Sequence, residues 1–374
     1  MTFEQGPIRP PSEAESLLIR INRNCPWNKC LFCPVYKGKK FSRRTVEEIK
    51  GDIQAFKEAE QKLKALSFRQ GHGGVITAQL MELVYQQEQE LFQVALWLYR
   101  GGKNVFLQDA DGLAMPPDKL VEVLNFLKKQ FPTVERITTY ARGKTAAKRS
   151  LEQLMAIRDA GLTRVHIGME TGYDPLLTTM RKGVTAAELI EGGKKLKEAG
   201  LSLSEYVLLG LGGKDGWEEH ILGTAEVLNA IDPHFIRLRT LALRHKIPLH
   251  EHVGAGLFQP QEDEGTAREV KLLLENLRVT STIVSDHILN LLEEIEGRLP
   301  WDMPRLLAVV NAYFEMPTER RENFRLGRRL GHYRILADME DKQRFADVER
   351  LRQSLSERGE DLEEFLANHL ARYV

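Results

Sequence analysis

The chain has 374 residues, and its 53 Lys and Arg balance 53 Asp and Glu, so the formal net charge is zero. This balance argues against a nucleic-acid binder that relies on a global basic field, although it does not exclude a local basic patch. No apolar run reaches the roughly 18 residues that a membrane-spanning helix needs. Residues 1–15 also lack the apolar stretch of a signal peptide. We therefore expect a cytoplasmic protein without a membrane partner.

Apolar, β-branched runs predict strands at 16–22, 104–108, 135–140, 164–169, 203–209 and 235–241. Amphipathic segments between them predict helices at 45–65, 81–99, 118–130, 150–160, 185–199 and 217–230. Strands that alternate with helices indicate βαβ units and a parallel sheet. Six strands are too few for a complete eight-stranded barrel. We therefore predict an α/β fold, a partial (β/α)6 TIM-like barrel, with a flat doubly wound sheet as the alternative.

The pattern changes after residue 250. Helices are predicted at 266–278, 281–296, 303–314, 318–329, 339–357 and 360–372, and no strand is predicted there. We expect three parts: an N-terminal extension at 1–15, a core barrel at 16–250, and a helical C-terminal region at 251–374. The last part would form a substrate lid or a small domain.

All the cysteines, Cys25, Cys30 and Cys33, lie within nine residues directly after the first predicted strand. An odd, tightly grouped set without an export signal predicts a metal site rather than disulfides. A structural zinc site almost always has four protein ligands, and no fourth cysteine exists. Three ligands leave an open position on the metal, which is typical of a catalytic site. The prolines and the stretch from Asn24 to Asn28 predict an irregular loop.

This loop resembles that of the radical S-adenosylmethionine (SAM) superfamily. The usual spacing there is three residues and then two; here it is four and then two, and Phe32 holds the aromatic position before the last cysteine. The resemblance implies a [4Fe–4S] cluster bound by Cys25, Cys30 and Cys33, which would then be the metal-binding and catalytic residues. It also implies SAM on the open iron, and its cleavage to a 5′-deoxyadenosyl radical that removes hydrogen from a substrate.

Further segments resemble SAM-contacting motifs of the branch with the oxygen-independent coproporphyrinogen oxidases and the methylthiotransferases. After the second strand, Asp109 and Asp111 would receive the SAM amino group, because a carboxylate accepts hydrogen bonds from an ammonium. The alternative for these two acids is a helix N-cap. The other cofactor-binding residues that the resemblance implies are Phe32, Arg142, Glu170, Arg181, Gly210 and Gly212.

These remaining residues divide by chemistry. Glu170 would contact SAM, whose ribose offers hydroxyls, and the guanidinium of Arg181 or Arg142 would bind its carboxylate. The alternative for the arginines is an ordinary surface ion pair. Gly210 and Gly212 would let the backbone approach the adenine, and their alternative is a plain βα turn.

The C-terminal region offers two more candidates. His287 and Asn290 are three apart, so a helix would place them on one face, although a structural histidine is the competing interpretation. Six arginines between 320 and 334 predict either a site for an acidic substrate or a solvated helix face. The arginines are Arg320, Arg321, Arg325, Arg328, Arg329 and Arg334.

No cysteine follows Cys33, so this chain supplies no auxiliary cluster. We expect hydrogen abstraction from a small-molecule substrate, acidic if the arginines form an anion site, with an electron donor such as flavodoxin or ferredoxin. One alternative is a radical SAM enzyme that modifies RNA or protein, which the zero net charge disfavours in the case of nucleic acid. The other is a non-catalytic zinc-binding interaction module.

Overall fold

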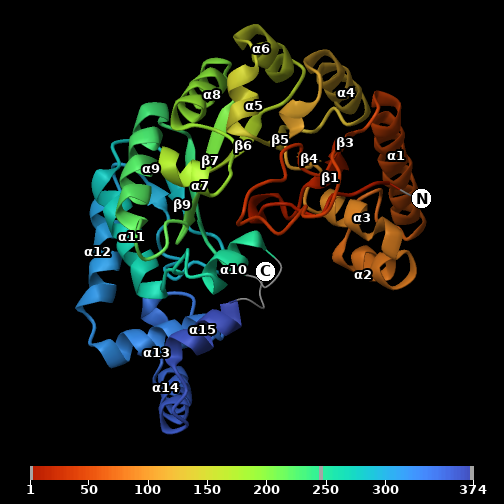
Figure 1. The fold of residues 1–374 in the computed structure, drawn as a ribbon. Helices are drawn as coiled ribbons and strands as arrows, with labels where there is room; N and C mark the ends of the chain where they lie inside the picture. The colour runs from red at the N-terminus through yellow and green to blue at the C-terminus, as the bar shows by residue number, and fades with distance from the viewer. Residues whose placement is uncertain (1–2, 244–246, 371–374) are drawn as a thin grey trace. The chain divides into compact units, whose positions relative to one another are not determined.

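The computed structural model describes residues 3–243 and 247–370, and Figure 1 labels their elements. The chain divides into two compact units. The first comprises Met1–Asn28, Gly38–Ile167 and Glu191–Leu203, and the second comprises Lys29–Lys37, Gly168–Ile190 and Ser204–Val374. Within the described ranges, no helix is both long enough and apolar enough to span a bilayer. The predicted boundary at residue 250 stays a prediction.

The main sheet has the strand order β1-β4-β5-β6-β7-β8-β9-β10. The pairs β1–β4, β4–β5, β5–β6 and β7–β8 are parallel. A doubly wound sheet would reverse its strand order at a switch point. The order here follows the chain, so the partial (β/α)6 barrel is confirmed and the doubly wound alternative is wrong. The six predicted strands are β1 (Leu17–Arg20), β4 (Asn104–Gln108), β5 (Arg136–Ala141), β6 (Arg164–Glu170), β7 (Ser202–Leu209) and β8 (Phe235–Thr240).

The first unit is covered by helices whose ends the sequence encodes locally. Helix α1 (Val46–Arg69) begins with a capping box, in which the Thr45 hydroxyl accepts the Glu48 amide at 3.1 Å and the Glu48 carboxylate accepts the Thr45 amide at 2.7 Å. Helix α1 packs against α4 (Pro117–Gln130), and α4 packs against α6 (Leu151–Asp159). Helix α5 (Gly143–Lys148) also belongs to this unit. Helix α8 (Ala186–Glu198) belongs to it from Glu191 onward.

One predicted helix in this unit is wrong as a single element. Residues 81–99 form α2 (Ala78–Gln87), a 3₁₀ turn (Gln89–Leu91) and α3 (Phe92–Tyr99). After the buried Val84, the next helical positions on the same face carry Gln and Glu. The apolar stripe is therefore interrupted until Leu91, and nothing on that face supports a continuous helix.

The second unit contains most of the remaining helices. Helix α11 packs against α9 and α12, and α13 packs against α14 and α15 (Figure 1). The predicted helical character is confirmed for these segments, while residues 371–372 of the last predicted helix lie outside the described residues. The helices are α7 (Asp174–Thr179), α9 (Trp217–Ile231), α10 (Pro248–Gly254), α11 (Asp263–Asn276), α12 (Met303–Glu315), α13 (Thr318–Arg329), α14 (Lys342–Glu357) and α15 (Leu362–Leu370). Short 3₁₀ turns lie at Pro11–Glu13, Gly112–Ala114 and Leu336–Glu340.

The predicted helix at 281–296 is wrong. Strand β9 (Thr282–Val284) pairs parallel to β8, and β10 (Gly297–Arg298) pairs antiparallel to β9. Three successive β-branched residues favour a strand over a helix. The sheet of the second unit thus continues beyond β8 into the region predicted to be helical.

Candidate functional site

The start of the cysteine loop is shaped by two asparagines. Asn24 has φ 70° and Asn28 has φ 50°, a left-handed backbone that asparagine adopts more readily than most residues. Their side-chain amides donate to Lys40 O at 2.7 Å and Lys39 O at 3.1 Å, beside the short β2 (Asn22–Arg23) and β3 (Ser42–Arg43) pair. The irregular loop is therefore confirmed. The Asn28 amide also donates to Cys25 Sγ at 3.4 Å.

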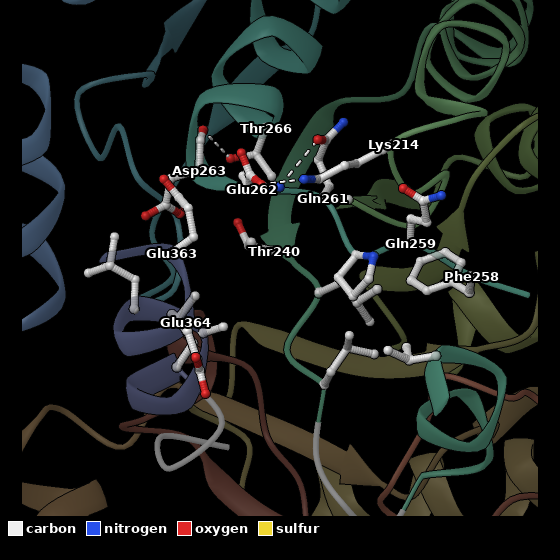
Figure 2. A pocket seen from close by; sticks show the side chains of 18 of the residues that line it. Lys214, Thr240, Phe258, Gln259, Gln261, Glu262, Asp263, Thr266, Glu363 and Glu364 are labelled. Carbon is white, nitrogen blue, oxygen red and sulfur yellow. Dashed lines mark hydrogen bonds and ion pairs between the residues drawn. The ribbon is translucent and has the colours of Figure 1, made fainter. Parts of the chain in front are cut away.

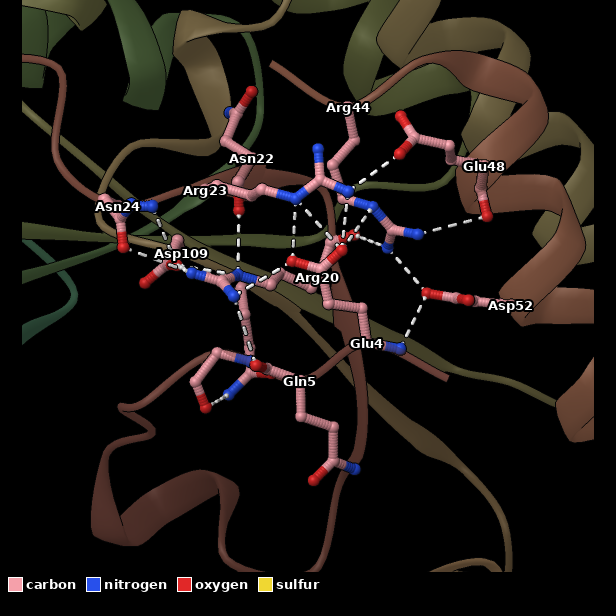
Figure 3. Close-up of polar contacts among 12 residues, drawn as sticks. Glu4, Gln5, Arg20, Asn22, Arg23, Asn24, Arg44, Glu48, Asp52 and Asp109 are labelled. Carbon is pink, nitrogen blue, oxygen red and sulfur yellow. Dashed lines mark hydrogen bonds and ion pairs between the residues drawn. The ribbon is translucent and has the colours of Figure 1, made fainter. Parts of the chain in front are cut away.

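Asp109 anchors this loop. Its buried carboxylate accepts Arg20 NH2 at 2.7 Å and the backbone amide of Asn24 at 3.1 Å. Figure 3 shows Asp109 within a network that also contains Glu4. The Glu4 carboxylate forms ion pairs with Arg20 at 3.0 Å and with Arg23 at 2.7 Å. The N-cap alternative does not describe Asp109, because its partners are a strand residue and the cysteine loop. The structure gives Asp109 the role of positioning the residue before Cys25.

Asp111 lies two residues further on and is fully buried. Its Oδ2 accepts the Thr145 hydroxyl at 2.6 Å, and its Oδ1 takes no hydrogen bond from the described residues. It makes no side-chain cap to the following 3₁₀ turn, so the N-cap alternative is wrong here too. Burial raises the pKa of Asp111 to about 6, against the opposing effect of the Thr145 hydrogen bond. Of the two acids, Asp111 is the one with remaining acceptor capacity.

Arg142 meets the cysteine loop through an aromatic ring. Its guanidinium lies 5.1 Å from the ring centroid of Trp27, which stands between Cys25 and Cys30 in the chain. This is a cation–π distance. Arg142 is thus more than a surface ion-pair residue, and it touches the predicted metal loop.

Cys30 and Cys33 belong to the second unit, where they pack against an apolar cluster. The buried members of that cluster come from the loop itself and from the ends of the second unit's elements: Leu31, Phe32, Met180, Leu211, Ile247 and Leu249. Backbone hydrogen bonds hold the loop there, from the Leu31 amide to Met180 O at 3.0 Å and from the Leu249 amide to Leu31 O at 3.1 Å. The cluster excludes water from one side of both thiols.

Two predicted residues come together through a third that the sequence analysis missed. Lys182 Nζ lies 3.0 Å from Glu170 Oε1 and 5.5 Å from the centroid of the Phe32 ring. Glu170 has φ 68° and Arg181 has φ 53°, so both ends of this motif are held in left-handed backbone. Lys182 directly follows Arg181, and its position in the same motif was the available signal. The Arg181 side chain is exposed.

The two predicted glycines are required by local geometry. Gly210 has φ 80°, and its amide donates to Glu269 Oε2 at 2.7 Å. At Gly212 a Cβ would lie 2.5 Å from Gly216 O, so only glycine fits. The tight turn after β7 explains both residues without a ligand, and their contact with adenine stays a prediction. Burial raises the pKa of Glu269 to about 8.

A cavity of about 450 Å³ lies in the second unit next to this turn (Figure 2). Its wall includes Gly210 and the apolar side chains of Leu241, Leu243 and Phe258. The same three apolar residues pack against the cluster that contacts Cys30 and Cys33. The cavity and the cysteine loop therefore share a wall. Helix α15 contributes to the other side through Leu366 and Leu370.

The arginine cluster is buried at its centre and exposed at Arg320 and Arg334. Arg329 pairs with Asp263 and donates to Leu289 O at 2.7 Å, and Arg325 pairs with Glu363. Arg328 NH2 lies 3.2 Å from Glu293 Oε2. These three arginines are buried. Both interpretations are corrected for this centre, which is a buried ion-pair network that joins α13 to α11 and α15, whereas the solvated face describes Arg320 and Arg334.

His287 and Asn290 do not share a helical face, because residues 285–292 form bends and turns. Asn290 is buried and donates to Leu238 O at 3.0 Å and Ser285 Oγ at 3.0 Å. Its own Oδ1 accepts the Thr240 hydroxyl at 3.0 Å. Asn290 is therefore a structural residue that ties this segment to β8.

The donor set fits the group that the sequence implies. All three cysteines are described as thiols without a disulfide, and thiolates are the usual ligands of iron–sulfur clusters. Within the described residues, no three His, Cys, Asp or Glu side chains meet closely enough to hold a metal ion. The fit therefore rests on three observations. The cysteines are suitable ligands, Cys30 and Cys33 have apolar surroundings, and Asp111 has a carboxylate oxygen that accepts no hydrogen bond from the described residues.

The strands of the main sheet follow one another in chain order, and the cysteine loop comes after the first of them. Enzymes with barrels of alternating parallel strands and helices place their active sites at the carboxyl ends of the strands. The model of the Radical SAM superfamily matches residues 19–225, more than half of the chain. The chain belongs to this superfamily. It is an enzyme of the radical SAM type whose cofactors are a [4Fe–4S] cluster and SAM.

Three solved structures illustrate the similarity. Archaeal Elp3 from Methanocaldococcus infernus is 15% identical over 57% of this chain and 53% of its own, with a TM-score of 0.42. Methylornithine synthase PylB is 16% identical over 81% and 82%, with a TM-score of 0.43. Coproporphyrinogen III oxidase HemN from Escherichia coli is 14% identical over 70% and 50%, with a TM-score of 0.43.

The chain spans about half the length of the Elp3 and HemN structures. Similarity at these levels carries no information about substrate. No curated protein matches the sequence.

Proposed function

We propose that this enzyme cleaves SAM reductively and uses the resulting radical to abstract hydrogen from a small organic molecule. The observation that supports this proposal is the cysteine trio that follows β1 and the short β2 in a chain of the radical SAM superfamily. When bound, the cluster supplies one electron, which breaks the SAM C5′–S bond to give methionine and a 5′-deoxyadenosyl radical. A low-potential donor such as flavodoxin or ferredoxin would provide that electron.

Cys25, Cys30 and Cys33 would hold the cluster, and the chain supplies the surroundings. The Asn28 amide, 3.4 Å from Cys25 Sγ, would stabilise a thiolate by donating to it. The apolar cluster behind Cys30 and Cys33 would exclude water, which protects a reactive radical from side reactions.

The remaining predicted residues divide the polar ends of SAM among them. Asp111, which has an unused buried oxygen, would accept the ammonium. Arg181 would bind the carboxylate and Glu170 the ribose, with Lys182 holding Glu170 in place at 3.0 Å. The cavity beside Gly210 has one apolar wall, formed by Leu241, Leu243 and Phe258, that suits the flat adenine.

The test uses the full chain purified anaerobically and reconstituted with iron and sulfide. We expect a brown protein with bound iron and sulfide that releases 5′-deoxyadenosine and methionine from SAM with dithionite as reductant. Cys30→Ala should lose both the cluster and the cleavage. A colourless protein that binds zinc and cleaves no SAM would refute the proposal. Addition of a metabolite extract should raise 5′-deoxyadenosine formation, whereas stimulation by tRNA alone would favour an RNA substrate.

A further inference from the structure

Two arginines on β8 lie on the face of the sheet that looks toward the cysteine loop of the same unit. Arg237 and Arg239 are two residues apart and so project to one side of the strand. Arg239 is the register partner of Leu208 on β7, and Leu208 packs against the cluster that contains Phe32 and contacts Cys30 and Cys33. Arg239 therefore lies next to a residue of the neighbouring strand, Leu208, that packs against the surroundings of Cys30 and Cys33.

These arginines share a single acid. Arg237 Nη1 donates to Asp286 Oδ2 at 2.7 Å, and Arg239 Nη1 donates to Asp286 Oδ1 at 2.8 Å. The side chains are 7% and 13% exposed for Arg237 and Arg239. Two largely buried guanidinium groups with one carboxylate leave one positive charge in excess. Such a charge is costly to bury unless another anion compensates it.

The two arginines differ in how far the protein satisfies them. Arg237 also donates from Nε to Ser204 Oγ at 3.2 Å. Arg239 Nη1 donates hydrogen bonds to both Asp286 and Leu238 O. Its buried Nη2 has no hydrogen-bond partner among the described residues. The face of Tyr206 lies 4.8 Å from the Arg239 guanidinium and fixes the plane of the fork. An oriented, unsatisfied guanidinium nitrogen is suited to receive a carboxylate oxygen.

His287 stands beside this group as a neutral donor. Burial first, and the positive charge of Arg239 second, lower the pKa of His287 to about 4, so the ring is uncharged near pH 7. The Leu289 amide donates to its Nδ1 at 3.4 Å. A neutral imidazole that accepts at Nδ1 carries its proton on Nε2. His287 thus offers a proton on Nε2, and it directly follows Asp286, the acid that pairs with Arg239.

We propose that Arg239 anchors a carboxylate of the substrate, so that the molecule from which hydrogen is abstracted is a carboxylic acid. This inference rests on the proposed function for the presence of a substrate, but its binding chemistry can be measured without turnover. The proposal concerns Arg239 and not the buried arginines of α13, which pair with Asp263, Glu293 and Glu363.

The test compares two small probes of the same shape, sodium propionate and neutral propionamide, at constant ionic strength. Saturation-transfer-difference NMR on the anaerobic, cluster-loaded enzyme should show saturable binding of propionate, about tenfold stronger than that of propionamide. In Arg239→Gln this preference should vanish. It should persist in Arg268→Gln, a control that removes an arginine of the same unit whose side chain is 59% exposed. Equal binding of both probes, or an unchanged preference in Arg239→Gln, would overturn the proposal.

Arg239→Lys covers the case in which the glutamine variant does not fold. It keeps the charge but loses the fork, so propionate binding should weaken about fivefold while the protein stays folded. SAM also carries a carboxylate, so a measurement of SAM cleavage distinguishes an Arg239 that binds the substrate from one that binds SAM. In Arg239→Gln or Arg239→Lys, 5′-deoxyadenosine formation without substrate should stay within about twofold of the parent. Loss of cleavage with an intact cluster would assign Arg239 to SAM and contradict the inference. If the parent enzyme itself cleaves no SAM, the proposed function fails, while the selectivity for propionate still decides this inference.

Discussion

The Asp109 carboxylate accepts the backbone amide of Asn24 at 3.1 Å, which places a buried acid directly after β4 in contact with the residue before Cys25. The same Oδ2 receives Arg20 of β1 at 2.7 Å. One acid therefore joins two neighbouring strands to the start of the cysteine loop. Asp109 thus holds the loop that would bind the metal, and the contact with the SAM amino group that the resemblance implies for it stays a prediction.

This arrangement predicts that Asp109→Asn lowers both stability and cluster content. The substitution leaves Arg20, whose side chain is 13% exposed, with only the partial compensation of Glu4. Breaking a buried ion pair costs about 3–5 kcal/mol, and we expect about 2–3 kcal/mol here because Glu4 remains. Urea unfolding and the iron content per chain after reconstitution measure the two effects.

The matched control for Asp109→Asn is Glu122→Gln, which removes a half-exposed pair with Lys50 in the same unit. Such pairs contribute about 0–1 kcal/mol. Equal losses in the two variants, or full iron content in Asp109→Asn, would show that Asp109 does not position the loop.

The contact between Lys182 and Glu170 predicts coupled effects on SAM binding. Glu170→Gln and Lys182→Met should each weaken SAM binding about tenfold while the cluster is retained, because each removes one member of a charge-assisted hydrogen bond. The double variant should weaken binding no further than the stronger single variant, since residues that act through one contact are not additive. Equilibrium dialysis with SAM under anaerobic conditions gives the affinities.

Lys194→Met, at an exposed position on α8, is the control for the loss of one lysine. Additive losses in the double variant would show that Lys182 and Glu170 contact SAM independently. Unchanged affinity in all three variants would remove both residues from the site.

Local sequence patterns predicted the parallel sheet because they encode it directly. The run Asn104–Gln108 is β4, and the capping box at Thr45 begins α1. The helix predicted at 281–296 failed because Thr282–Val284 pairs with β8, a partner 47 residues away by register, and this pairing is not visible in the local pattern. Periodicity describes one segment, whereas a short edge strand is decided by its neighbour.

The candidate site shows the same contrast between what a local sequence pattern predicts and what contacts between distant segments decide. The grouped cysteines predict a metal site, and the resemblance of their loop to that of the radical SAM superfamily implies the roles of Cys25, Cys30, Cys33 and Phe32. The partners of the charged residues could not be predicted, since Arg20 meets Asp109 across 89 residues of chain and Arg329 meets Asp263 across 66. A sequence shows where charges occur but not which of them are neutralised by burial next to an opposite charge.

The buried pair of Arg329 and Asp263 predicts a large stability loss when one partner is removed. Arg329→Met leaves the buried Asp263 without its close partner, since Arg325 lies 4.0 Å away, and we expect a loss of about 3–5 kcal/mol in the free energy of unfolding. Arg329→Met with Asp263→Leu should recover most of that loss, because no unpaired charge then remains. Arg334→Gln, whose side chain is 78% exposed, should change stability by less than about 0.5 kcal/mol. A double variant no more stable than Arg329→Met would contradict the assignment.

The burial of Glu269 predicts a pH dependence of stability, although the hydrogen bond from the Gly210 amide opposes the effect of burial on its pKa. Burial raises the pKa of Glu269 from 4.5 to about 8, so between these values the folded state binds the proton and the unfolded state releases it. The contribution of Glu269 to stability is therefore complete below about pH 4.5 and is lost as the pH rises through about 8. At about 1.4 kcal/mol per pH unit, the loss amounts to about 3–5 kcal/mol.

Glu269→Gln isolates this group from other buried acids such as Glu205, whose pKa burial also raises. The amide oxygen of glutamine can still accept the Gly210 amide but cannot ionise. We expect Glu269→Gln to match the parent at pH 5 and to be more stable than the parent at pH 9, as measured by urea unfolding at a series of pH values. Glu275→Gln, at an exposed position on the same helix, should follow the parent at every pH. A stability difference between Glu269→Gln and the parent that stays constant with pH would show that Glu269 is ionised in the folded enzyme.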